Sequence, residues 1–139
     1  MRLMTSAFAD GQRIPGDFAF CVPDAAAHVR LSANIHPDFA WSELPPETQS
    51  LALICHDPDV PSRGDDVNQE GRFVPASLAR ADFYHWILID LPANTLPISR
   101  GEFSRGVTAR GKTGPGAARG AGQGLNDYTG WFAADKDMS

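Results

Sequence analysis

The sequence lacks any apolar run that approaches the roughly 18 residues needed to span a membrane, and its first residues lack the apolar segment of a secretory signal. Basic residues are in the minority, since 12 Lys and Arg stand against 17 Asp and Glu, which gives a net charge of −5. A general nucleic-acid-binding protein normally carries a basic excess. Cysteine is scarce, and Cys21 and Cys55 fit reduced thiols better than a disulfide framework. These absences predict a cytoplasmic protein with no membrane span and no nucleic-acid partner.

Amphipathic segments of helix length without breakers are lacking as well. The chain contains 13 Gly and 11 Pro among 139 residues, and these divide it into short pieces. A chain of this length has room for one domain, residues 1–139. Hydrophobic residues make up 42% of the chain, as in an ordinary globular domain. We therefore expect one folded domain with few and short helices.

What the chain does contain is a set of short apolar segments bounded by turn residues, a pattern typical of strands. These segments are Phe18–Val22, His28–Ala33, Leu51–His56 and Phe83–Leu91. The last two are apolar on both faces, which predicts central strands with both faces covered. Short strands between loops rich in Gly and Pro predict an all-β fold, either a sandwich or a barrel.

The polar residues with candidate chemistry lie at strand ends. Asp57 follows the apolar strand 51–56 and shares a face with its alternate residues, so its carboxylate is expected at the margin of the core. Pro58 and Pro61 restrict the backbone, which predicts a rigid turn that holds Asp57 and Asp59 in place. The simpler interpretation is a loop in which the Asp side chains bond to neighbouring amides.

His85 is the second candidate. It shares a strand face with Phe83 and Ile87, where a single histidine is more often a core residue than a ligand. If the two strands converge, Asp57 and His85 place a hydrogen-bond acceptor and a titratable donor at the mouth of one pocket. No close-spaced pair of His or Cys supports a metal site. We predict no metal and no cofactor.

A nucleotide-binding pattern also occurs in the chain. Residues 106–113 match G-x-x-x-x-G-K-[ST] at every fixed position. That loop requires a buried strand before it and a helix after it, whereas residues 100–105 do not read as a buried strand and residues 114–120 contain Pro and repeated Gly, which oppose a helix. An NTPase that uses Gly106–Thr113, or a hydrolase that uses Asp57 and His85 as an acid/base pair, is the alternative to a binding function.

Two segments carry a resemblance to a known family. Ser50–Pro61 and His85–Pro92 resemble the phosphatidylethanolamine-binding protein family, and more closely its bacterial, Raf-kinase-inhibitor-like branch. Supporting segments lie in the same order along nearly the whole chain, at Phe8–Pro15, Trp41–Pro45 and Gly124–Tyr128. The resemblance implies a Greek-key β-sandwich of two antiparallel sheets with a small anion pocket at one end.

The resemblance also implies a function. Members of the family bind phosphate-bearing groups such as the phosphoethanolamine head group, many act on protein partners such as kinases, and they are not established enzymes. Transferred by motif, Asp57 and His85 line the pocket, while Asp59 and Pro61 shape its wall. The sequence thus predicts a non-catalytic module that binds a small phosphorylated or anionic head group and regulates a protein partner.

The chain departs from the family pattern in two places. The family continues with a Gly-Pro-x-x-Pro turn and a strand with a His-x-Tyr pair, and neither occurs before Ser139. We therefore expect a C-terminally truncated domain whose exposed sheet edge favours aggregation, strand exchange or a homodimer. His36 lies where the family usually has Ser before Pro, so it is a local difference.

Overall fold

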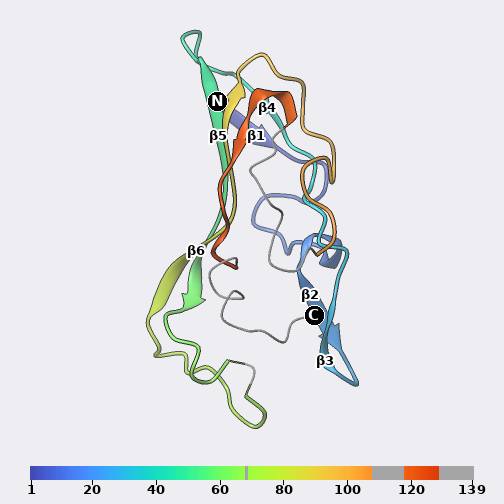
Figure 1. The fold of residues 1–139 in the computed structure, drawn as a ribbon, viewed down its shortest axis with the longest axis vertical. Coiled ribbons are helices and arrows are strands. Elements are labelled where there is room, and N and C mark those ends of the chain that lie inside the picture. Colours follow the sequence, from blue (N-terminus) through green and yellow to red (C-terminus); the bar gives the residue numbers. More distant parts are fainter. Residues whose placement is uncertain (68, 108–117, 129–139) are drawn as a thin grey trace.

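The computed structural model describes residues 1–67, 69–107 and 118–128 (Figure 1). Its strands are β1 (Arg2–Met4), β2 (Cys21–Asp24), β3 (His28–Leu31), β4 (Ala40–Ser42), β5 (Ser50–Pro61), β6 (Arg80–Pro92) and β7 (Gly122–Gln123). The two 3-10 helices are η1 (Gly16–Phe18) and η2 (Ala118–Gly120). The prediction of a mostly β fold is confirmed. Among the described residues, no helix has the length and apolar character needed to cross a membrane.

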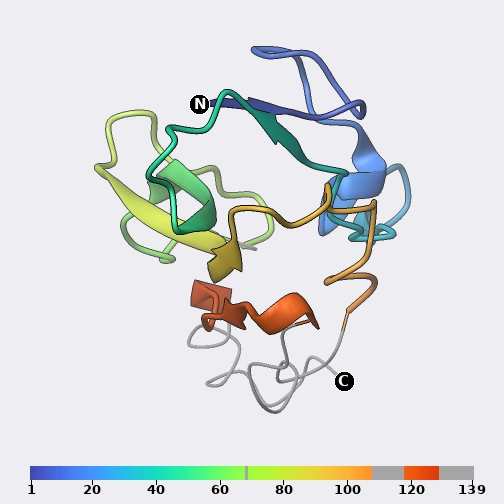
Figure 2. The same ribbon diagram turned by 90° about the horizontal axis from the view of Figure 1, so that it is seen from above.

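The described strands form three antiparallel sheets. β1 pairs with β4, β2 pairs with β3, and the largest sheet has the order β5–β6–β7. Viewed from above, the β5–β6 hairpin lies on one side of the molecule and η1 with β2 and β3 on the other (Figure 2). The antiparallel pairing agrees with the expected fold class, and the Greek-key sandwich stays a prediction.

The strand predictions differ from the structure in two ways. Residues 51–56 were expected to form a central strand, yet within the described residues β5 lies at an edge of its sheet and β6 is the central strand. The expected strand at 18–22 begins later, because the amides of Phe18 and Ala19 donate to the carbonyls of Pro15 and Gly16 and form η1. Apolar runs identify strands, but they do not show which strands acquire two neighbours.

A β-bulge interrupts β6 at His85. Cys55 pairs with Trp86 and His56 pairs with Tyr84, so His85 is the extra residue between two pairs. An extra residue changes the alternation of side chains along a strand and increases its local twist. The rings of Phe83 and His85 nevertheless lie 5.0 Å apart, so the face that the sequence predicts for these two residues is the same in the structure.

A second irregularity lies in β5 and involves the prolines. Asp57 pairs with Phe83 and Val60 pairs with Ala81, which leaves Pro58 and Asp59 opposite a single residue. Proline has no N–H to donate, so an irregular position suits it. The predicted rigid turn is thus wrong in one respect, because strand β5 continues through it to Pro61.

The hydrophobic core packs against one face of β6. Leu88, Leu91 and Ile98 are fully buried, and Phe103 and Ala121 complete the cluster. Partly buried residues surround it, namely Phe39, Trp41, Leu51, Leu53 and Trp86. The backbones of Phe39 and Ile98 join across the core by two hydrogen bonds of 3.0 and 2.8 Å. The core therefore ties β6 to the segments that follow β3 and β6 in the chain.

His36, the local departure from the family pattern, is partly buried and packs against this core. Its ring stacks on Trp86 with the centroids 4.9 Å apart. The backbone N–H of Phe103 donates to Nε2 at 2.8 Å, and Nδ1 lies 2.6 Å from the carbonyl oxygen of Pro37. A nitrogen that accepts a hydrogen bond carries no proton, so the hydrogen is on Nδ1 and the ring is neutral. Burial lowers the pKa of His36, which favours the same neutral form.

Mild acid is expected to destabilise the fold through His36. Because burial lowers its pKa in the folded chain, the unfolded chain, with a histidine pKa of roughly 6.5, binds the proton more readily. The contribution of His36 is complete above about pH 6.5 and is lost as the pH falls towards the folded pKa. Urea unfolding of the wild type and His36→Gln at two pH values on either side of that point measures it. The wild type should lose more stability than the variant, and equal losses would contradict this role.

Candidate functional site

The structure brings Asp57 and His85 together from two strands. Asp57 lies on β5 opposite Phe83, and His85 is the bulged residue of β6. His85 Nε2 is 3.9 Å from Asp57 Oδ2, and the two side chains are 32% and 44% exposed. Both groups are thus within reach of a ligand in solvent. The expected convergence of the two side chains is observed, and ligand binding by them stays a prediction.

The orientation of Asp57 has a local cause. Its Oδ1 accepts a hydrogen bond of 2.8 Å from the backbone N–H of Asp59. This contact across Pro58 is an Asx turn, in which an Asp side chain bonds to the backbone two residues further on. Oδ1 is therefore engaged locally, and Oδ2 is the oxygen that lies nearest to His85. The simpler interpretation, in which an Asp side chain bonds to a neighbouring amide, is correct for Asp57. The contact with His85 exists in addition to that bond.

Asp59 and Pro61, the expected pocket wall, lie further along the hairpin. Asp59 is exposed and pairs with Arg80, whose Nε is 3.5 Å from Asp59 Oδ1. Pro61 is half-buried and lies opposite Arg80 in the strand register. Arg80 thus places a cation at the end of the hairpin that contains Asp57. Sequence reasoning did not select it.

Tyr128 is a further residue of the site that sequence reasoning missed. Its ring centroid lies 5.5 Å from that of His85, 4.8 Å from that of Phe83 and 5.6 Å from that of Phe20. Burial raises the pKa of Tyr128, and the charges of Cys21 and Asp57 raise it further. The phenol therefore keeps its hydrogen at neutral pH and with it a donor group.

The position of Tyr128 follows from the docking of its segment along β6. The N–H of Tyr84 donates to Asp127 Oδ2 at 2.7 Å, and the N–H of Gly124 donates to the carbonyl of Ile87 at 2.9 Å. The indole of Trp86 adds a bond of 2.8 Å to Gln123 Oε1. No local spacing signals these contacts, because the two segments are far apart in the sequence.

The β5–β6 hairpin carries a second His–Asp pair. His56 Nε2 is 2.9 Å from Asp82 Oδ1, and the His56 ring stacks on Tyr84 with the centroids 5.0 Å apart. In the described part of the chain, no group of three or more His, Cys, Asp or Glu side chains is arranged to hold a metal ion. The hairpin thus offers two His–Asp pairs of different geometry, a close one at His56 and a looser one at His85.

Comparison with known proteins identifies the family. The sequence profile described as phosphatidylethanolamine-binding protein matches residues 4–137. The chain belongs to this family. The resemblance seen in the sequence, including its bacterial branch, is confirmed.

Alignments with curated relatives in this family extend over most of the chain. UPF0098 protein YbhB of Escherichia coli K12 is 27% identical over 109 residues, which are 78% of this chain and 54% of that protein. A UPF0098 protein of Methanothermobacter thermautotrophicus is 32% identical over 95 residues, or 68% of this chain and 44% of that protein. The chain spans about half the length of these curated relatives.

The nucleotide-loop pattern lies outside the short segments that carry the resemblance in the sequence, and most of it lies outside the described residues. Within residues 106–113, the structure describes only Gly106 and Val107. The N–H of Gly106 donates to the carbonyl of Ala33 at 3.0 Å, and the Asn34 amide donates to the carbonyl of Gly106 at 2.9 Å. These contacts fix the position of Gly106. Nucleotide binding by residues 106–113 stays a prediction.

Proposed function

We propose that this chain binds a small phosphate-bearing or otherwise anionic head group beside His85 and catalyses no reaction. The observation that carries the proposal is the approach of His85 to Asp57 at the exposed surface of the β5–β6 hairpin. Membership of the phosphatidylethanolamine-binding protein family supports it, because the family is described by the binding of such a lipid.

The chemistry of the site suits a head group that carries both charges. A protonated His85 donates a charge-assisted hydrogen bond to a phosphate oxygen, and Tyr128 adds a phenol whose ring lies beside it. Asp57 accepts a hydrogen bond from His85 or from an ammonium group of the ligand. The same carboxylate repels a phosphate that comes too close. Phosphoethanolamine, with a phosphate and an ammonium, matches this pair.

The proposal includes the wider expectations from the sequence. Residues 1–139 form a single domain with the two-sheet Greek-key sandwich of the family, and the antiparallel pairing of the described strands supports this arrangement. The protein acts in the cytoplasm and regulates a protein partner such as a kinase, either as a monomer or as a homodimer. Asp59 and Pro61 belong to the wall of the binding site, next to Arg80.

Isothermal titration with O-phosphorylethanolamine tests the site. His85→Ala removes a charged hydrogen bond, and we expect at least tenfold weaker binding, since such bonds contribute about 1.5–3 kcal/mol. His56→Ala is the matched control, because it removes the same side chain from the other His–Asp pair and should leave affinity unchanged. Equal affinity of the wild type and both variants would contradict the assignment. Release of phosphate from a phosphoester, abolished by Asp57→Asn, would favour the hydrolase alternative.

A further inference from the structure

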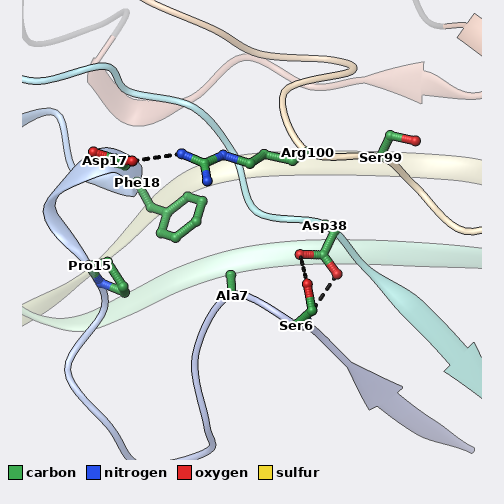
Figure 3. A pocket seen from close by; sticks show the side chains of 8 residues that line it. All are labelled: Ser6, Ala7, Pro15, Asp17, Phe18, Asp38, Ser99 and Arg100. Carbon is green, nitrogen blue, oxygen red and sulfur yellow. Dashed lines mark hydrogen bonds and ion pairs between the residues drawn. The ribbon is translucent and has the colours of Figure 1, made fainter.

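A cleft with polar and apolar lining residues lies away from the Asp57–His85 pair. It has a volume of about 620 Å³ and lies between the N-terminal segment, η1 and the loop that follows Ile98 (Figure 3). Its lining residues are Ser6, Ala7, Pro15, Asp17, Phe18, Asp38, Ser99 and Arg100. None of them belongs to the proposed head-group site. The volume lies within the range typical of sites for small ligands.

One wall of the cleft is electrically balanced. Arg100 Nη2 donates to Asp17 Oδ2 at 2.7 Å, and the Arg100 guanidinium lies over the ring of Phe18, 4.8 Å from its centroid. Figure 3 shows these three side chains on the same side of the cleft. The ion pair offsets the charge of Arg100 with that of Asp17, and the cation–π contact with Phe18 helps to orient the guanidinium.

The opposite wall carries a carboxylate without a counter-charge. Asp38 accepts hydrogen bonds from the backbone N–H of Ser6 (2.9 Å) and from the hydroxyls of Ser6 (2.9 Å) and Thr5 (3.4 Å). All three donors are neutral, so they orient the carboxylate without neutralising it. Among the residues that the structure describes, no Lys, Arg or His forms an ion pair with Asp38. The hydrogen bonds, above all that from the Ser6 N–H, lower the pKa of Asp38 and keep it charged.

We propose that this cleft binds a small organic cation, with a protonated amine of the ligand on Asp38 and its carbon chain against Ala7, Pro15 and Phe18. Asp17 and Asp38 against Arg100 leave the lining with one net negative charge. The chain as a whole carries −5. Both charges attract a cation and repel an anion. The inference is independent of the head-group site, because the two share no residue.

Titration with 1,4-diaminobutane tests this site. We expect saturable binding to the wild type, at least tenfold weaker binding to Asp38→Asn, and no binding of butane-1,4-diol, which has the same chain without charge. Asp10→Asn is the matched control, since it removes the same charge from an exposed position of the N-terminal segment and should leave binding unchanged. Ala7→Phe fills the cleft and keeps the bonds of Asp38, so it should also abolish binding if Asp38→Asn fails to fold.

Two results would overturn the proposal. One is the absence of saturable diamine binding to the wild type. The other is equal weakening by Asp10→Asn and Asp38→Asn, which would show a general charge effect. Titration with inorganic phosphate, which carries no amine, keeps this test separate from the head-group site. Phosphate binding should respond to His85→Ala and not to Ala7→Phe.

Discussion

Leu88→Ala is expected to lower the free energy of unfolding by about 2–5 kcal/mol, the usual cost of truncating a fully buried leucine. Leu88 is 0% exposed and lies at the centre of the core cluster with Leu91 and Ile98. It pairs with Leu53 on one side and with Gln123 on the other, so β5 and β7 both flank it. Backbone hydrogen bonds on both sides of β6 limit how far the strands can move to fill the cavity left by the truncation. We therefore expect a loss of stability in the upper part of this range.

Leu125→Ala is the matched control for this prediction. Leu125 is 76% exposed, and the same truncation there should change stability by no more than about 0.5 kcal/mol. Urea denaturation gives the midpoint and slope for each variant. A loss at Leu88 no larger than that at Leu125 would show that β6 is not the centre of the fold.

Arg119→Met is expected to cost about 2 kcal/mol, because it breaks a shielded ion pair. Arg119 Nη2 donates to Glu102 Oε2 at 2.8 Å, and its guanidinium also contacts the carbonyls of Leu96 and Pro97. The Arg119 and Glu102 side chains are only 25% and 22% exposed. The substitution leaves the Glu102 charge without its partner and releases the segment that leads into β7. Partial solvent access keeps the loss below that of a fully buried pair.

Arg63→Met provides the comparison. Arg63 Nε lies 3.5 Å from Asp65 Oδ2, and these side chains are 69% and 68% exposed. Exposed ion pairs contribute little, so we expect a change within about 0.5 kcal/mol. Thermal unfolding of both variants at low and high salt measures the difference. Indistinguishable losses for Arg119→Met and Arg63→Met would mean that the Arg119 contacts do not hold the segment in place.

Local sequence patterns predicted the parts of the molecule that depend on near neighbours. The apolar runs around Leu53 and Leu88 indicated the strands of the long hairpin, because side-chain alternation and turn residues act over a few positions. The motif around Asp57 and the histidine at position 85 indicated the candidate pair for the same reason. The family, too, is encoded in short segments, and the profile match from residue 4 to residue 137 confirms it.

The candidate site also includes residues outside these segments. Their positions depend on contacts between distant parts of the chain. Tyr128 lies beside His85 because Asp127 accepts the amide of Tyr84, and no spacing in the sequence encodes that bond. His36 is a residue type that often binds ligands, but here its role is structural. Its two ring nitrogens form hydrogen bonds with the backbone of Phe103 and Pro37. A list of polar residues does not distinguish the two roles.

The sequence by itself determined the mostly β class and the family, and it singled out Asp57 and His85, the two side chains that we propose bind an anionic head group. Only the tertiary structure decided that His85 occupies a bulge, that β5 lies at an edge of the described sheet, and that Asp38 faces a cleft without a counter-charge. The physical reason is that side-chain pattern sets which residues prefer burial, whereas strand register and the meeting of distant loops depend on how the whole chain packs.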